Sequence, residues 1–446
     1  MLSGLLPIPV CDACVVLISF HPPIGYNASG IHPAHSSRER RGELAFETRR
    51  NPHSLGASAS REKGTSTCVK SQDYISSIET GGEFMIESVN ITNFRGFPTL
   101  EVSNLRKINL LVGKNSSGKS AFLEAIFLAS GSVAALAVFT LRATRRMGSN
   151  QITRPTDAQT YRGLWEDLFF DFKEKRISIK VIGDPVSDSR QLWIDYTRSQ
   201  AQELPFGKQD TSSAMNLEQI TAMPQIEFRW KRTGYPEILS QPKFTNTGLE
   251  TDSKEVSYFP CIWYTPGAGE LPDENAKRFS ELDKRGDGKL DLIKEAIYKE
   301  FSFIKSLSIQ YHAGTPMMFA ELDKRPRKMP VALLSDGINR LLGICISLGY
   351  FAGGTMLIDQ FEDGFHFSLL PSIWSSIYKL AAEFKVQLFV STHSRECMDA
   401  MLPIVKGHED EFSLLRASRT EMTGCTITSL PGSYLENALE QEFEVR

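Results

Sequence analysis

Apolar and polar positions along the chain follow two periods, one typical of strands and one typical of helices. Alternation and short apolar runs predict strands over residues 86–91, 100–102, 108–112, 177–182, 191–196, 225–230, 259–264, 307–311, 317–320, 355–358 and 386–393. Helical spacing predicts helices over residues 121–142, 290–303, 338–346 and 370–384. The motifs that carry chemistry lie at the ends of these elements.

Residues 1–84 follow neither period. They mix Pro, Gly, Ser, Arg and His, a composition typical of a disordered or loosely held extension. Met85 opens the first strand pattern, and Gly81-Gly82-Glu83 before it could be encoded by a purine-rich ribosome-binding sequence. An alternative is therefore that 1–84 is not native coding sequence, which native protein beginning before Met85 would exclude.

The most specific motif is Val-Gly-Lys-Asn-Ser-Ser-Gly-Lys-Ser at residues 112–120. It matches the P-loop pattern, with the strand before it and the helix after it that the pattern requires, which a chance Gly/Ser-rich turn would lack. Gly113 and Gly118 let the backbone curl so that N–H groups face phosphate oxygens. Lys119 supplies positive charge for the β- and γ-phosphates, and Ser120 supplies a hydroxyl for a nucleotide-bound Mg²⁺. The other loop residues that we expect to bind nucleotide are Asn115, Ser116 and Ser117.

Three later motifs are weaker when taken singly. Ser335 and Gly337 open an apolar helix pattern and can bind phosphate through a hydroxyl and backbone N–H groups, although alone they indicate only a good N-cap. A four-residue apolar run leads into Asp359, as in a buried strand that delivers a carboxylate to Mg²⁺. Another strand ends at His393, where open α/β sheets bind ligands, so we interpret it as nucleotide-sensing rather than as a capping or core histidine.

Composition narrows the classes of partner. With 50 Lys+Arg against 53 Asp+Glu, net charge gives no evidence for nucleic-acid binding. Seven scattered cysteines fit a reducing cytoplasm better than a disulfide framework, and the single Cys-x-x-Cys pair, Cys11 and Cys14, is weak evidence for zinc. Because no apolar run reaches the length of a transmembrane helix, we expect a cytoplasmic location without membrane contact.

The order of the motifs resembles the head of ABC-type P-loop ATPases: P-loop, Leu-Ser-Asp-Gly at 334–337, strand to Asp359 and strand to His393. Among these, the chain resembles the RecF, SMC and OLD (overcoming lysogenization defect) relatives and the stand-alone ATPases of the AAA-fifteen group. That group includes the ATPase subunit of the PARIS anti-phage system. The resemblance implies an α/β P-loop NTPase fold of the ABC/SMC head type, with a mixed sheet, an antiparallel β subdomain and a helical signature lobe.

The resemblance also implies a division of the chain and a shared site. Residues 85–330 would form the P-loop lobe with a β-rich inserted region, and 331–446 the signature helix, Walker B strand and switch histidine. ATP and Mg²⁺ would bind between two copies of the chain, in a homodimer or larger oligomer. Ser335 and Gly337 of one copy would touch the γ-phosphate held by the other, while Asp359 and His393 would act in their own copy. Arg95 matches a position that often approaches the nucleotide, the alternative being a surface-turn arginine.

One departure concerns catalysis. The family usually has Glu after the Walker B aspartate, whereas this chain has Gln360. An amide can orient water but cannot accept its proton, so we expect ATP binding to survive and turnover to be impaired. Three explanations stay open: an engineered substitution that traps the ATP-bound dimer, which we favour, a natural loss of turnover, or replacement by Glu362, although two residues along it would point differently.

Two biological roles follow from the resemblance. The first is a sensor or scaffold in bacterial anti-phage defence with a separately encoded effector, expected to be a toprim-type nuclease, since no acidic cluster typical of such a nuclease follows His393. The alternative is a RecF-like ATPase of DNA repair or recombination. Its DNA contacts would come from two basic clusters, each more often a solvated face: Arg142, Arg145 and Arg146, and Lys324, Arg325, Arg327 and Lys328.

Overall fold

The computed structural model of this 446-residue chain describes residues 85–131, 134–144, 158–184, 188–198, 224–245, 248–251, 259–265, 272–420 and 424–440. The expectations for the extension 1–84 and for the Cys11–Cys14 pair therefore lie outside the described residues.

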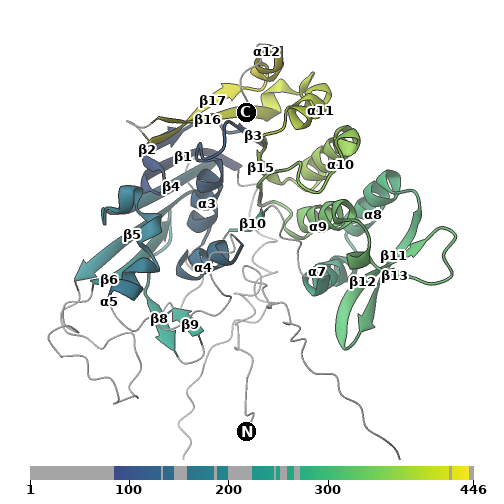
Figure 1. The fold of residues 1–446 in the computed structure, drawn as a ribbon, viewed down its shortest axis with the longest axis horizontal. Coiled ribbons are helices and arrows are strands. Elements are labelled where there is room, and N and C mark those ends of the chain that lie inside the picture. Colours follow the sequence, from purple (N-terminus) through teal and green to yellow (C-terminus); the bar gives the residue numbers. More distant parts are fainter. Residues whose placement is uncertain are drawn as a thin grey trace, which may run out of the picture.

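A six-stranded sheet forms the centre of the molecule (Figure 1), with strand order β10-β14-β15-β3-β16-β17. Its strands are β3 (Ile108–Val112), β10 (Cys261–Tyr264), β14 (Thr355–Ile358), β15 (Gln387–Ser391), β16 (Phe412–Thr420) and β17 (Gly424–Pro431). Five strands run parallel, and β17 pairs antiparallel with β16. Because β3 inserts between β15 and β16, the stretches 85–330 and 331–446 build this sheet together.

Successive residues of the parallel strands enter two different cores. Ile358 and Val390 belong to one core, and their neighbours Leu357 and Phe389 belong to the other. All four are fully buried, as expected for a parallel sheet that is covered on both faces. The P-loop helix α3 (Lys119–Ala129) and an antiparallel sheet cover one face, and a helical lobe covers the other (Figure 1).

The antiparallel sheet has the order β2-β1-β4-β5-β6-β7. Its strands are β1 (Met85–Phe94), β2 (Phe97–Val102), β4 (Ile177–Asp184), β5 (Ser189–Arg198), β6 (Pro224–Arg232) and β7 (Ile238–Ser240). The accompanying elements are α4 (Ala134–Thr144), α5 (Ala158–Gly163), η1 (Glu166–Leu168), η2 (Phe170–Phe172), β8 (Pro242–Thr245) and β9 (Gly248–Thr251). The indole of Trp230 donates to the Ala129 carbonyl at 2.9 Å, which ties the end of α3 to this sheet.

The helical lobe lies on the other side of the central sheet (Figure 1). Its helices are α7 (Pro272–Arg285), α8 (Lys289–Glu300), α9 (Asp336–Tyr350), α10 (Leu370–Glu383) and α11 (Arg395–Val405). A small sheet of β11 (Ile304–His312), β12 (Thr315–Leu322) and β13 (Met329–Pro330) lies at its outer edge. The remaining short elements are η3 (Val331–Leu333), η4 (Phe367–Leu369), η5 (Glu409–Glu411) and α12 (Tyr434–Glu440).

The predicted single helix over 121–142 is wrong, because the structure has two helices there. Helix α3 ends at Ala129, and α4 begins at Ala134. The carbonyls at the break have partners elsewhere: Ala129 accepts from the Trp230 indole, and Ser130 accepts from the Phe259 N–H at 2.8 Å. Helix α7 and the β16–β17 hairpin are additions that the periodicity did not predict.

The α/β architecture expected from the sequence is confirmed: a mixed central sheet, an antiparallel β part and a helical lobe that carries residues 334–337. Among the described residues, no helix is both long enough and apolar enough to cross a membrane.

Candidate nucleotide-binding site

The P-loop turns between β3 and α3 through residues with left-handed backbone. Gly113 has φ +144°, Ser116 +61° and Gly118 +101°. A Cβ built at Gly113 would lie 2.2 Å from the Ala417 carbonyl oxygen, and one at Gly118 would lie 2.9 Å from the Cys425 Cβ. The loop is therefore packed against the β16–β17 hairpin, and both positions need glycine for space as well as for conformation.

Lys119 lies inside this loop rather than on the surface. Its Nζ donates to the carbonyls of Gly113 at 2.7 Å and Lys114 at 3.0 Å. Burial lowers the pKa of Lys119, while the nearby carboxylates of Asp359 and Glu362 act to raise it. The ammonium is thus placed among acceptors that phosphate oxygens can replace.

The other P-loop side chains differ in exposure. Asn115 and Ser116 are exposed at the tip of the loop, Ser117 is buried, and Ser120 is half-buried in the first turn of α3. The Ser117 hydroxyl has no hydrogen-bond partner within the described part of the chain. Exposed backbone at the tip and a hydroxyl in the first turn are the features that a phosphate and its Mg²⁺ require.

Asp359 follows directly after β14 and is only 6% exposed. Its Oδ1 accepts a hydrogen bond from the Ser391 hydroxyl, and the Ser391 Oγ in turn accepts from the Gln360 N–H at 2.9 Å. Ser391, at the end of the neighbouring strand β15, therefore fixes the carboxylate. One carboxylate with the Ser120 hydroxyl fits Mg²⁺, which usually completes its shell with phosphate and water oxygens rather than with a protein-only cage. No group of three or more His, Cys, Asp or Glu side chains forms such a cage among the described residues.

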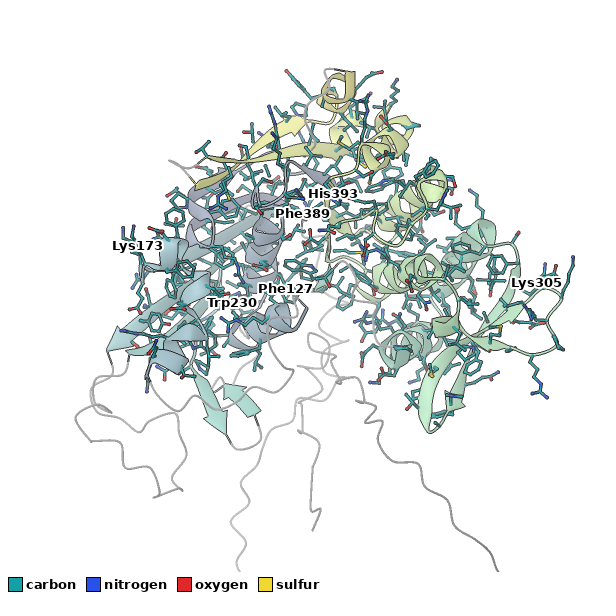
Figure 2. The ribbon with its side chains drawn as sticks, viewed as in Figure 1. Phe127, Lys173, Trp230, Lys305, Phe389 and His393 are labelled. Carbon is teal, nitrogen blue, oxygen red and sulfur yellow. The ribbon has the colours of Figure 1, made fainter. Side chains whose placement is uncertain are left out.

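Glu362 and His393 form a pair beside Asp359. The Glu362 Oε1 lies 2.8 Å from the His393 Nδ1 and accepts from the His393 backbone N–H at 3.1 Å. The other oxygen, Oε2, is buried and has no hydrogen-bond partner in the described part of the chain. Gln360 has φ +50°, so the chain turns sharply after the strand, and this turn brings Glu362 to His393. Figure 2 labels His393, which follows β15 and lies toward the middle of the view.

The signature segment, residues 334–337, makes its side-chain hydrogen bond within the first turn of α9. The exposed Ser335 is the N-cap of α9, and its hydroxyl accepts from the Ile338 N–H at 3.3 Å. Gly337 lies against the loop after the Walker B strand, because a Cβ there would lie 2.7 Å from the Gly364 carbonyl. The structure thus brings together the P-loop, Asp359, Glu362 and His393 in one copy. The contact of Ser335 and Gly337 with a second copy stays a prediction.

Arg95 is half-buried in an ion-pair network. Its Nε pairs with Glu124 of the P-loop helix, and its guanidinium also bonds Asp167 at 3.0 Å. Asp167 pairs in addition with Arg142, one of the cations considered for DNA contact. These contacts tie the β1–β2 turn to α3 and α4. The approach of Arg95 to nucleotide stays a prediction, and Arg145 and Arg146 lie outside the described residues.

Two residues that position the site were missed by the sequence reasoning. Ser391 fixes Asp359 as described above, and Arg340 donates to main-chain carbonyls at the end of β14. The sequence signal for Ser391 is its place at the end of an apolar run, two residues before His393. Arg340 carries no signal, because an arginine in a helix is most often on the surface.

Three features together define a P-loop ATPase. They are the P-loop after β3, the buried aspartate after β14, which is two strands away in the sheet, and the carboxylate–histidine pair beside it. Residues 108–399 match a family described as "AAA domain, putative AbiEii toxin, Type IV TA system". The match spans more than half of the chain, so the chain belongs to this family and is an ATPase of the AAA class.

Individual proteins show more distant likenesses. The chain is 20% identical over 387 residues to an "ATP/GTP phosphatase" of Helicobacter pylori, covering 81% of this chain and 98% of that protein. A stretch of 43 residues is 46% identical to the DNA replication and repair protein RecF of Idiomarina loihiensis, covering 10% and 12% of the two chains. Among solved structures, an SMC head bound to the C-terminal winged-helix domain of ScpA aligns with a TM-score of 0.43 and 13% identity, covering 79% of this chain and 99% of that chain. A Pyrococcus furiosus Smc head aligns with a TM-score of 0.39 and 12% identity, covering 80% and 99%.

Proposed function

We propose that this chain binds Mg²⁺–ATP at the P-loop and that two copies pair around the nucleotide. The strongest support is that the nucleotide-binding motifs form two separate groups within one copy. The P-loop and Asp359 gather with Glu362 and His393, whereas Ser335 presents an exposed helix N-terminus whose own contacts are local. A γ-phosphate held by one copy would fit such an N-terminus on another copy.

Light scattering on the full chain tests the pairing directly. We expect the mass to double on addition of ATP and Mg²⁺ and to return to that of one copy when EDTA removes the metal. Lys119→Met is the matched control, because it removes the phosphate-binding ammonium and should prevent the change. A mass that is the same with and without ATP would contradict the proposal.

Hydrolysis would need a group that accepts a proton from water. Gln360 cannot do so, whereas the Glu362 carboxylate can: His393 holds one oxygen, and the other is buried without a partner in the described part of the chain. We propose Glu362 as the base of the residual turnover. We also keep the proposal that Gln360 is an engineered trap of the ATP-bound dimer.

Two substitutions separate these assignments. Gln360→Glu should raise kcat by about 10²–10⁴-fold, the usual contribution of a positioned general base. Glu362→Gln, which keeps the size and loses the base, should abolish the residual turnover and leave ATP affinity unchanged. No rise for the first variant contradicts the trap, and unchanged kcat for the second contradicts Glu362 as base.

In the cell, we propose a sensor or scaffold in anti-phage defence that holds a separately encoded effector, expected to be a toprim-type nuclease. The resemblance to OLD-type ATPases supports this, as does the family's description as a putative toxin of a toxin–antitoxin system. The short, close match to RecF supports the alternative, an ATPase of DNA repair. Co-purification with the product of a neighbouring gene favours defence, whereas ATP-dependent, salt-sensitive DNA binding by the chain alone favours repair.

A further inference from the structure

Arg340 lies in the second turn of α9, five residues after Ser335, and its guanidinium is directed toward the Walker B strand. One terminal nitrogen donates to the Thr265 carbonyl at 3.2 Å, and the other donates to the carbonyls of Asp359 at 3.2 Å and Gln360 at 2.9 Å. The side chain is 9% exposed, so these carbonyls, rather than water, accept its hydrogen bonds. Its hydrogen bonds all go to main-chain carbonyls, and it also forms a longer ion pair with Asp363 Oδ2 at 4.0 Å, on the same loop. Hydrogen bonds to main-chain carbonyls fix the path of the backbone.

The backbone that Arg340 holds is the loop between the metal ligand and the proposed base. Gln360 has a left-handed backbone, which is unfavourable for a residue other than glycine and needs support from its surroundings. Support comes from two sides. The Ser391 hydroxyl accepts from the Gln360 N–H, and Arg340 donates to the Gln360 carbonyl. Glu362 follows two residues later, so a shift of this peptide moves the carboxylate relative to the P-loop.

The first turn of α9 is in contact with the same loop. Gly337 approaches the Gly364 carbonyl so closely that a Cβ would lie 2.7 Å from it. A Cβ at Gly364, which has φ +76°, would in turn lie 3.6 Å from the Arg340 Cδ. The first two turns of α9 and the stretch 359–364 are therefore joined by van der Waals contact at Gly337 and by two hydrogen bonds from Arg340. In a close-packed interior, a shift of one is transmitted to the other.

We propose that Arg340 is a positioning residue that couples the signature segment of a copy to the base of that same copy. The inference rests on the proposed pairing of two copies around ATP. When Ser335 and Gly337 engage the nucleotide of the partner, α9 shifts and Arg340 carries the shift to Gln360 and Glu362. Each site would then reach its active geometry only when the other site is filled, so turnover would be cooperative in ATP.

The test compares Arg340→Met with Arg285→Met in the full chain, both alone and combined with Gln360→Glu to raise turnover. Arg285 is a matched control, since it is half-buried in the same lobe and donates to the Tyr350 carbonyl at 3.4 Å. We expect Arg340→Met to keep ATP affinity within about threefold, to lower kcat at least about tenfold and to reduce the Hill coefficient for ATP from near two to one. Arg340→Lys, which can reach only part of the carbonyl set, should fall between, and Arg285→Met should change neither quantity.

Unchanged kcat and Hill coefficient in Arg340→Met would overturn the proposal, and so would equal losses in Arg285→Met. If Arg340→Met does not fold, hydrogen exchange in the unmodified chain replaces it. The amides of Gln360 and Phe361 should then exchange more slowly once ATP pairs the copies, and unchanged exchange in a paired sample contradicts the coupling. Absence of any ATP-dependent pairing would instead refute the proposed function itself, so the two failures are distinguishable.

Discussion

Lys119 carries a positive charge inside the protein, and two sets of acceptors compete for it. The loop carbonyls of Gly113 and Lys114 hold the ammonium now, and phosphate oxygens would replace them. Lys119→Met keeps the volume and removes the charge. Because hydrogen bonds to charged groups contribute about 1.5–3 kcal/mol, we expect ATP affinity to fall by about ten- to hundredfold, measured by titration with a fluorescent nucleotide. Lys107→Met, at an exposed ion pair with Glu411, should leave the affinity unchanged.

Gly113 tests whether the loop geometry is needed for the fold as well as for binding. Alanine at this position would combine φ +144° with a Cβ 2.2 Å from a carbonyl oxygen of β16. We expect Gly113→Ala to lower the free energy of unfolding by about 2 kcal/mol or more and to abolish ATP binding, since strain at special backbone angles gives the larger mutational effects. Gly163→Ala has open space around it and should be close to neutral in urea titrations.

The residues that sequence reasoning placed correctly are those fixed by strand ends. Asp359 and His393 each follow an apolar run, and carboxyl ends of neighbouring parallel strands meet at one edge of a sheet. The sequence predicts that Glu362 points differently from residue 360, and in the structure the left-handed Gln360 turns the chain and pairs Glu362 with His393. Backbone of that kind at a non-glycine residue has no sequence signature, so this pairing required the structure.

Helix α9 has a hydroxyl at its N-terminus that can serve both the fold and the nucleotide. The Ser335 cap is worth about 1 kcal/mol to the stability of the chain. Ser335→Ala should lose this amount and also weaken ATP-dependent pairing. Ser335→Asp separates the two effects, because a carboxylate still caps the helix but repels a γ-phosphate. We expect Ser335→Asp to keep the unfolding midpoint in urea and to lose pairing by light scattering. Pairing that survives in Ser335→Asp would contradict contact between Ser335 and nucleotide.

At the scale of elements, periodicity predicted most strands and the helices that carry one apolar face. It joined α3 and α4 because both are mostly apolar, and only Ser130, Gly131 and Ser132 interrupt the run between them. The break is set by partners distant in the sequence, namely Trp230 and Phe259. The hairpin β16–β17 was missed for a similar reason: β16 gains its place by pairing with β3, some three hundred residues earlier.

At the scale of the whole molecule, a buried amide links strands of the two large sheets. The Gln387 side chain accepts from the Ile86 N–H and donates to the Ile86 carbonyl, both at 2.8 Å, and it also donates to the Arg106 carbonyl at 2.8 Å. Gln387 begins β15 of the central sheet, whereas Ile86 belongs to β1 of the antiparallel sheet. The amide thus satisfies main-chain groups at a junction where neither sheet ladder reaches them.

Gln387→Met has nearly the same shape and removes these hydrogen bonds, leaving buried main-chain groups of Ile86 without this partner. Since each such group costs about 1–3 kcal/mol, we expect the free energy of unfolding to fall by about 2–4 kcal/mol in urea titrations. Gln191→Met is the control, because Gln191 is half-buried within the antiparallel sheet and donates one hydrogen bond, to the Ser178 hydroxyl. It should lose less than about 1 kcal/mol. Equal losses for the two variants would mean that the junction between the sheets depends on apolar packing and not on this amide.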